Sequence, residues 1–108
     1  MEKVTFKKIQ KVSNLIVKKF RPEKIILFGS FAWGKPSLDS DVDFMIIKKT
    51  KEDKHKDQIS LGQILFGKSM PIDTLIYTPE EVQKRLSLGD FFIRNILEKG
   101  KILYEKKK

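Results

Sequence analysis

The stretch from Gly29 to Asp43 constrains the fold of this chain more than any other part of the sequence. It lies between two apolar runs, residues 25–28 and 44–47. Short apolar runs bounded by Gly, Pro, Ser and Asp predict buried β-strands joined by a loop. We predict strands over residues 24–28 and 42–47. The second strand is apolar on both faces, so it should be central in the sheet.

Two carboxylates, Asp41 and Asp43, open the second strand at positions i and i+2. Side chains in a strand alternate between faces, so both point the same way, with Cα atoms about 6.5 Å apart. Such neighbouring like charges raise a carboxyl pKa, and a divalent cation removes that penalty. The spacing suits two metal ions about 3.5–4 Å apart. Oxygen ligands favour Mg²⁺ or Mn²⁺ over zinc.

A Gly-Ser pair, Gly29 and Ser30, follows the first strand. Gly29 has no Cβ, so a phosphate can approach the backbone closely. We expect Ser30 at the start of a short helix over residues 31–33, where free N–H groups bind anions. Gly34 and Pro36 should then end this helix.

Taken together, these features resemble a known signature: a strand, Gly29-Ser30, ten intervening residues, Asp41-x-Asp43 and a second strand. This pattern is similar to that of the DNA polymerase β-like nucleotidyltransferase superfamily. The match is closest to its minimal, single-domain members, the MNT proteins, and among them to the MntA-type antitoxins that partner HEPN-domain toxins. The alternative, a fortuitous acidic turn, does not account for the combination.

The resemblance implies a reaction and a set of ligands. A nucleoside triphosphate such as ATP would give its nucleoside monophosphate to an acceptor hydroxyl, with two Mg²⁺ ions as cofactors (or Mn²⁺). The catalytic and metal-binding residues implied are Asp41, Asp43 and, from a later strand, Asp73. Many relatives carry a basic residue in the Gly-Ser helix, where this chain has Phe, Ala and Trp, so Lys35 is expected to supply the charge. The nucleotide-binding residues expected are Gly29, Ser30, Lys35 and Ser40.

A third strand over residues 71–77 carries Asp73 near its beginning, just as Asp43 lies near the beginning of the second strand. If both carboxylates meet at one site, the two strands are parallel and a crossover helix within residues 51–66 connects them. The first strand ends at that site, so it runs antiparallel to the second. The expected fold is α/β (α+β): a mixed sheet of about four strands with helices packed on it, and the active site at one edge.

Other segments predict the remaining elements. Apolar residues recur with helical spacing over residues 4–20, and Pro22 stops that helix. Ile59, Leu61, Ile64, Leu65 and Phe66 suggest the apolar part of the crossover helix. Thr78 to Glu81 reads as a capping box that opens a helix. A further helix follows Asp90 and ends at Gly100, and residues 102–104 form a last edge strand.

Composition adds limits. The 108 residues predict one domain, 1–108, and the chain has no cysteine. No apolar run has membrane length and no leader pattern is visible, which predicts a cytoplasmic protein. The net charge of +9 rests on lysine, with only three arginines, and this argues against sequence-specific nucleic-acid binding. His55 is expected to be solvent-exposed, and residues 48–58 are either a helix start or a loop.

Two functional classes follow. In the first, the chain is an enzyme that transfers AMP to a tyrosine of a HEPN-domain toxin and so acts as its antitoxin. In the second, it is a non-catalytic MNT module that neutralises a partner by contact. A basic RNA-binding domain is a third, less favoured class, because Arg-Gly features are missing. Trp33 either packs on the core or lines a nucleotide pocket or partner interface.

Overall fold

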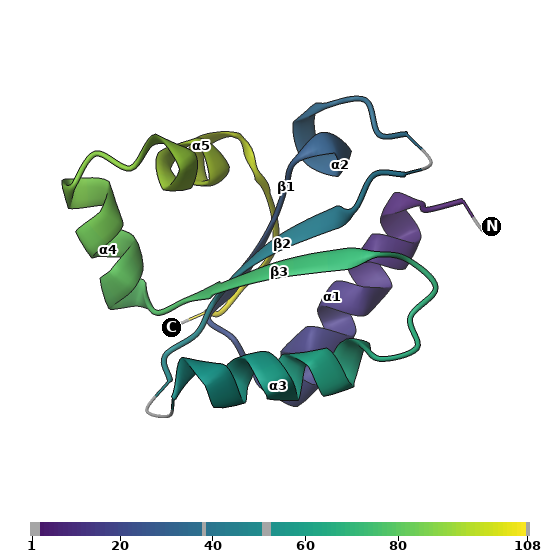
Figure 1. The fold of residues 1–108 in the computed structure, drawn as a ribbon, viewed down its shortest axis with the longest axis horizontal. Helices are drawn as coiled ribbons and strands as arrows, with labels where there is room; N and C mark the ends of the chain where they lie inside the picture. The colour runs from purple at the N-terminus through teal and green to yellow at the C-terminus, as the bar shows by residue number, and fades with distance from the viewer. Residues whose placement is uncertain (1–2, 38, 51–52, 108) are drawn as a thin grey trace.

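The computed structural model describes residues 3–37, 39–50 and 53–107. These residues form four strands and five helices, whose arrangement can be followed in Figure 1. Within the described residues, no helix is both long and apolar enough to cross a membrane. The elements are α1 (Phe6–Phe20), β1 (Lys24–Phe28), α2 (Ser30–Trp33), β2 (Val42–Ile47), α3 (Lys54–Leu65), β3 (Ile72–Tyr77), α4 (Pro79–Ser87), α5 (Phe91–Lys99) and β4 (Lys101–Glu105).

The four strands form one mixed sheet in the order β3-β2-β1-β4. β2 runs parallel to β3 and antiparallel to β1, which confirms the topology inferred from the two carboxylates. β2 is central and β4 lies at an edge, as predicted. A bulge interrupts the pairing of β1 with β4 between Ile25 and Ile26.

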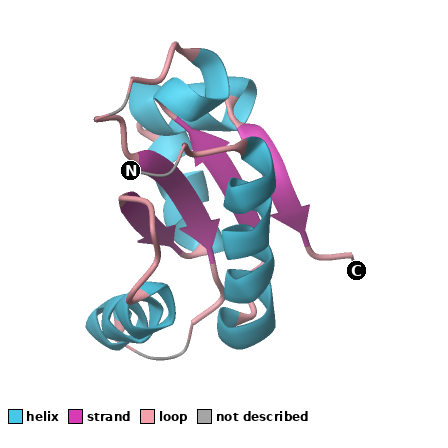
Figure 2. Ribbon diagram, turned by 90° about the vertical axis from the view of Figure 1, so that its right-hand side faces the viewer, coloured by secondary structure: helices cyan, strands magenta, loops and turns pink. Residues whose placement is uncertain are grey.

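Helices cover both faces of this sheet (Figures 1 and 2). β2 contributes buried side chains to both faces, which is why its sequence is continuously apolar. One core lies beneath α1 and α3 and contains Ile9, Val12, Ile16, Phe20, Ile25, Leu27, Val42, Phe44, Ile46, Leu61, Met70 and Ile76. The other lies beneath α4 and α5 and contains Ile26, Phe28, Met45, Ile47, Val82, Ile93 and Ile96.

Local sequence signals fix the helix ends. The Thr78 hydroxyl accepts a hydrogen bond from Glu81 N–H at 3.1 Å, and the Glu81 carboxylate accepts one from Thr78 N–H at 3.0 Å. This is the predicted capping box. α1 ends at Phe20 because Arg21 adopts a left-handed conformation, φ 53° and ψ 57°, and Pro22 follows.

The crossover helix lies within the predicted range, but its apolar face differs from the expectation. α3 begins at Lys54, where the Asp53 side chain caps it, and residues 48–50 and 53 are not helical; positions 51 and 52 lie outside the described residues. Ile59 and Phe66, expected on its apolar face, are 51% and 87% exposed, whereas Leu61 is fully buried. A narrow stripe of buried residues is sufficient to pack α3 on the sheet, because α3 covers only part of one sheet face. His55 is exposed, as predicted.

The narrow contact of α3 includes a buried carboxylate, Asp57, whose side chain is 5% exposed. Lys48 Nζ lies 3.4 Å from Asp57 Oδ1 and 4.1 Å from the centre of the Phe20 ring. Asp57 Oδ2 is buried without a hydrogen-bond partner among the described residues. Lys48 therefore provides the charge that compensates this carboxylate.

We expect Lys48→Met to lower the free energy of unfolding by about 1–3 kcal/mol, because it leaves Asp57 buried without its cation. The double variant Lys48→Met/Asp57→Leu should recover much of that loss, since two apolar groups replace a buried ion pair with little penalty. Urea denaturation at pH 7 measures both variants. A double variant less stable than the single one would contradict this account.

Candidate active site

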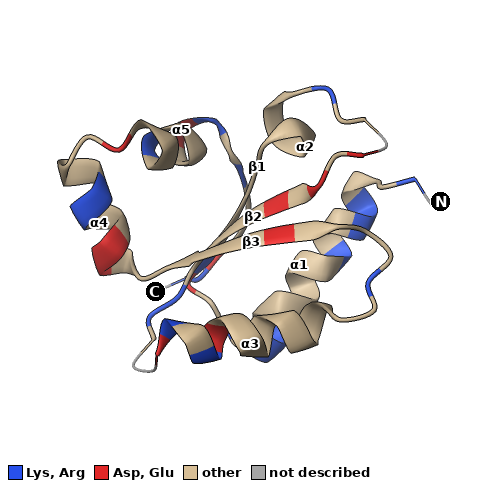
Figure 3. Cartoon of the chain, in the orientation of Figure 1, with Lys and Arg blue, Asp and Glu red and all other residues tan. Residues whose placement is uncertain are grey.

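Three carboxylates gather where β2 and β3 begin, side by side in the sheet (Figure 3). Asp41 immediately precedes β2, and Asp43 is the second residue of that strand. Asp73 is the second residue of β3 and is the register partner of Asp43. The parallel pairing therefore brings residues 30 positions apart in the sequence next to one another.

The electrostatics of this group show mutual repulsion. A side-chain hydrogen bond with Asp73 raises the pKa of Asp41, and desolvation and the Asp73 charge add to the rise. The pKa of Asp43 is raised chiefly by burial, with further contributions from the charges of Asp73 and Asp41. These carboxylates therefore favour a proton or a cation in their midst.

The described residues include no group of three or more carboxylate, imidazole or thiol side chains arranged closely enough to hold a metal ion by themselves. Nor is any ion pair between Asp73 and a Lys or Arg found in the described part of the chain. The alternative role of Asp73, as a salt-bridge residue of an edge strand, therefore has no observed partner.

Gly29 packs directly against Asp43. Its backbone, at φ 78° and ψ −158°, lies in a region that is essentially restricted to glycine. A Cβ at this position would overlap Asp43 Oδ2 and would lie 3.2 Å from Asp43 Cγ. The glycine thus keeps a space in which the Asp43 carboxylate rests.

Ser30 begins α2 beside this glycine. The N–H groups of Ala32 and Trp33 donate to Gly29 C=O at 2.9 and 3.1 Å. The N–H groups of Ser30 and Phe31 come earlier in the helix, where no intrahelical carbonyl can accept from them. The Gly-Ser pair thus forms the short helix start that the sequence predicted.

The two other residues expected to bind nucleotide lie in the loop after α2. Lys35 is exposed. The Ser40 hydroxyl accepts a hydrogen bond from Ser37 N–H at 2.8 Å and lies 3.3 Å from the Ser37 hydroxyl, so it is already engaged in a turn. The hydrogen bonds between Ser37 and Ser40 stabilise the turn that precedes Asp41.

One neighbour of the carboxylates was missed from the sequence. Phe28 pairs with Asp43 across β1 and β2, and the rings of Trp33 and Phe92 contact the Phe28 ring. The pairing of 28 with 43 could have been found by counting back along both predicted strands. The contact with Phe92 depends on how α5 packs, and no spacing in the sequence indicates it.

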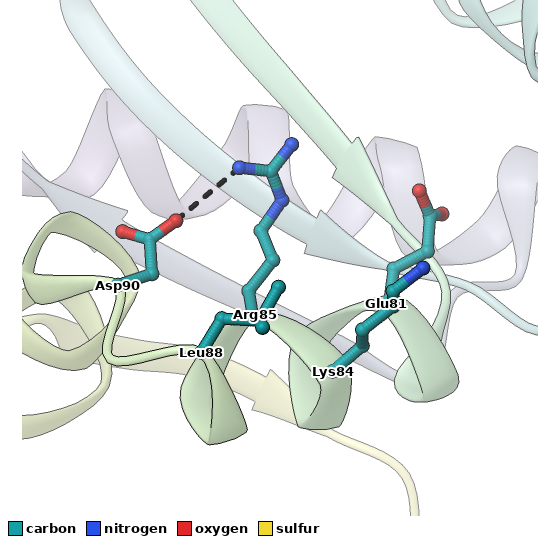
Figure 4. A pocket seen from close by; sticks show the side chains of 5 residues that line it. All are labelled: Glu81, Lys84, Arg85, Leu88 and Asp90. Carbon is teal, nitrogen blue, oxygen red and sulfur yellow. Dashed lines mark hydrogen bonds and ion pairs between the residues drawn. The ribbon is translucent and has the colours of Figure 1, made fainter.

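A cavity of about 390 Å³ lies beside α4 and is lined by Glu81, Lys84, Arg85, Leu88 and Asp90 (Figure 4). Arg85 Nη1 donates to Asp90 Oδ2 at 3.2 Å across it. The carboxylates at the start of β2 and β3 do not line this cavity. The cavity is therefore separate from the group of carboxylates, and neither Asp43 nor Asp73 lines it.

Comparison with known proteins identifies the class. Residues 10–108 match the family model "Polymerase beta, Nucleotidyltransferase". The chain belongs to this family and is a nucleotidyltransferase. It is also 32% identical over 100 residues to a Methanocaldococcus jannaschii protein named "Putative protein adenylyltransferase", across 91% of this chain and 96% of that protein.

Solved structures show the same fold. A chain described as a "putative nucleotidyltransferase from Sulfolobus solfataricus" aligns with a TM-score of 0.64 and 18% identity, over 94% of this chain and 81% of that one. A mutant MntA–HpeT toxin–antitoxin structure aligns with a TM-score of 0.56 and 17% identity, over 90% and 73% of the two chains. The mixed four-stranded sheet is therefore that of the nucleotidyltransferases.

Proposed function

We propose that this protein transfers AMP from ATP to a hydroxyl group of a partner protein, in a reaction that depends on Mg²⁺. The observation that carries the proposal is the register pairing of Asp43 with Asp73, with Asp41 near enough to Asp73 for its pKa to be raised and with Gly29 against Asp43. Such a set of oxygen ligands next to a helix start suits a triphosphate and its divalent cation.

The residues divide into two roles under this proposal. Asp41, Asp43 and Asp73 would hold the metal ions together with the phosphate oxygens of the nucleotide, since the three carboxylates do not lie closely enough to hold a metal ion by themselves. A bound cation would relieve the repulsion that raises the pKa values of Asp41 and Asp43. Bound Mg²⁺ would neutralise the charge that develops on the transferred phosphoryl group. Asp73, on the exposed edge strand, would accept the proton of the attacking hydroxyl. Ser30 and the backbone at Gly29 would hold the β- and γ-phosphates, with Lys35 nearby.

A protein acceptor is supported by the name of the M. jannaschii relative, a protein adenylyltransferase. The likeness to the MntA–HpeT chain suggests a toxin as that protein, so this chain would act as an antitoxin. We extend the proposal to a HEPN-domain toxin and to one of its tyrosines. The net charge of +9 would favour association with an acidic partner.

Co-expression of this protein with the proposed HEPN-domain toxin tests the proposal. The complex is purified and the mass of the toxin is measured after incubation with ATP and Mg²⁺, and again without ATP. Each transferred AMP should add about 329 Da with release of pyrophosphate, as phosphoryl-transfer chemistry at the α-phosphate requires. If the toxin binds but keeps its mass, the proposed transfer is refuted, and the second functional class, a non-catalytic module that neutralises its partner by contact, accounts for the complex. If the toxin does not bind, the antitoxin role is refuted.

Asp73→Asn distinguishes a metal ligand from a residue of structural importance only. We expect this variant to lose transfer as severely as variants of Asp41 and Asp43, with little change in its urea midpoint, because Asp73 is exposed and has no cationic partner among the described residues. Rates and urea midpoints are measured on the same preparations. A near-normal rate would remove Asp73 from the proposed metal site.

A further inference from the structure

Three aromatic rings border the carboxylates on one side. Phe28 is the last residue of β1 and lies opposite Asp43 in the antiparallel pair, so the two side chains share a face of the sheet. The Trp33 ring centre is 6.4 Å from that of Phe28, with the planes tilted by 34°. The Phe92 ring centre is 5.8 Å from it in an edge-on arrangement at 87°.

The two outer rings are unusually open for large aromatic side chains. Phe28 is 8% exposed, whereas Trp33 is 44% and Phe92 53% exposed. Apolar surface that remains exposed next to a polar site is typical of a surface that a ligand covers. Phe28 thus contacts two aromatic rings that both remain partly exposed to solvent.

The backbone that carries each outer ring is held by hydrogen bonds. The Asp90 side chain caps α5 by accepting hydrogen bonds from Phe92 N–H at 3.0 Å and Ile93 N–H at 3.1 Å. Arg85 in turn holds Asp90 at 3.2 Å across the cavity shown in Figure 4. The backbone N–H of Trp33 donates a hydrogen bond to the backbone carbonyl of Gly29 at 3.1 Å. A backbone that is already ordered loses little further entropy when a ligand binds to the rings that it carries.

We propose that Phe92 and Trp33, supported by Phe28, form the platform on which the base of the nucleoside triphosphate stacks. This inference rests on the proposed function for its triphosphate substrate. Directly paired residues in an antiparallel ladder have Cα atoms about 4.5–5.5 Å apart, so Phe28 lies next to Asp43 and the two outer rings lie one ring contact further away. A base attached through its ribose to an α-phosphate at the carboxylates would lie on this side of the site.

Stacking dictates a particular selectivity. An aromatic ring recognises the π-face of a base and not its hydrogen-bonding edge. The platform should therefore favour the larger purines over pyrimidines and separate ATP poorly from GTP. Phe91 precedes Phe92 in α5 and is 80% exposed. It offers a matched control, because the observed ring contacts of Phe28 are with Trp33 and Phe92.

Trp33 is the only tryptophan, so its fluorescence reports on the platform directly. The protein is titrated with ATP, GTP, CTP, UTP, adenosine and inorganic tripolyphosphate, each with Mg²⁺, and calorimetry gives the dissociation constants. ATP and GTP should quench the indole most and adenosine should quench it at higher concentration. Tripolyphosphate should bind without quenching. Equal quenching by tripolyphosphate and ATP would refute the platform.

Phe92→Leu should raise the dissociation constant and the KM for ATP about tenfold, with kcat and tripolyphosphate affinity unchanged. Phe92→Trp should restore affinity, and Phe91→Leu should bind ATP like the unmodified protein. If Phe92→Leu also binds ATP normally, or weakens ATP and tripolyphosphate equally, the inference is wrong. Stacking without transfer to any toxin would refute the proposed function alone, and transfer with an unchanged KM in Phe92→Leu would refute the platform alone.

Discussion

Asp43→Asn should lower the rate of nucleotidyl transfer by at least about 10³, which corresponds to a barrier higher by about 4 kcal/mol. The reason is the place of Asp43 between Gly29 and Asp73, where its carboxylate would contact the cation that neutralises the transferred group. Asp41→Asn should have an effect of the same order. Single-turnover transfer from labelled ATP measures both.

The same substitution should not destabilise the metal-free protein. Burial and the neighbouring charges raise the pKa of Asp43, so the ionised carboxylate disfavours the folded state at pH 7. That penalty is absent below the ordinary pKa of 3.8, develops as the pH rises from 3.8 to the raised pKa, and is complete above the raised pKa. The melting temperature of Asp43→Asn should therefore equal or exceed that of the unmodified protein at pH 7, and the difference should vanish below about pH 3.8.

Asp39→Asn is the control for this pair of measurements. Asp39 is exposed in the same loop, and its N–H donates to the Ser37 hydroxyl at 3.3 Å, so the variant removes one nearby charge and leaves the loop contact intact. It should retain transfer. Substantial transfer by both Asp41→Asn and Asp43→Asn would refute the assignment of these carboxylates to the metal site.

Gly29→Ala should reduce both stability and transfer. The backbone at φ 78° and ψ −158° would cost a residue with a Cβ about 1–3 kcal/mol. In addition, the new methyl group would overlap Asp43 Oδ2 and displace the carboxylate. We expect transfer to fall by at least about 10², because a misplacement of about 1 Å at a reacting centre can have that effect.

Gly67→Ala separates the effect of backbone strain from the effect of displacing the Asp43 carboxylate. Gly67 also has a positive φ, 79°, but a Cβ there would meet no atom of the described residues within 4 Å. This variant should therefore lose stability through backbone strain and keep its transfer rate at temperatures where it is folded. Circular-dichroism melting and the transfer assay are performed on both variants. Equal loss of transfer in both would show that the space beside Asp43 is not required.

The sequence predicted the part of the fold that depends on local patterns. The bounds of β1 and β2, the capping box at Thr78 and the end of α1 before Pro22 all follow from apolar runs and cap residues. The pairing of β2 with β3 required one additional assumption, that Asp43 and Asp73 serve one site, and the observed register agrees with it.

Features that depend on tertiary packing could not be predicted in this way. The periodicity of α3 suggested a wide apolar face, yet Phe66 lies beyond the helix and is exposed, because α3 covers only part of one sheet face. The contact of Phe92 with Phe28 is set by the angle at which α5 crosses β1, which a single sequence does not encode in any spacing. The raised pKa that the sequence predicted for the Asp41–Asp43 pair is confirmed, but the share that Asp73 contributes depends on side-chain distances across strands.

The separation of the two cores by the sheet has an evolutionary consequence. Asp43 and Asp73 lie on the face covered by α4 and α5, while α1 and α3 pack on the opposite face. Relatives can therefore exchange residues beneath α1 and α3, or change the lysines outside them, while substrate preference stays the same. Substitutions on the α4–α5 side change residues that share a sheet face with Asp43 and Asp73. Divergence of specificity within this lineage should thus accumulate among the residues of that face, whatever their position along the chain.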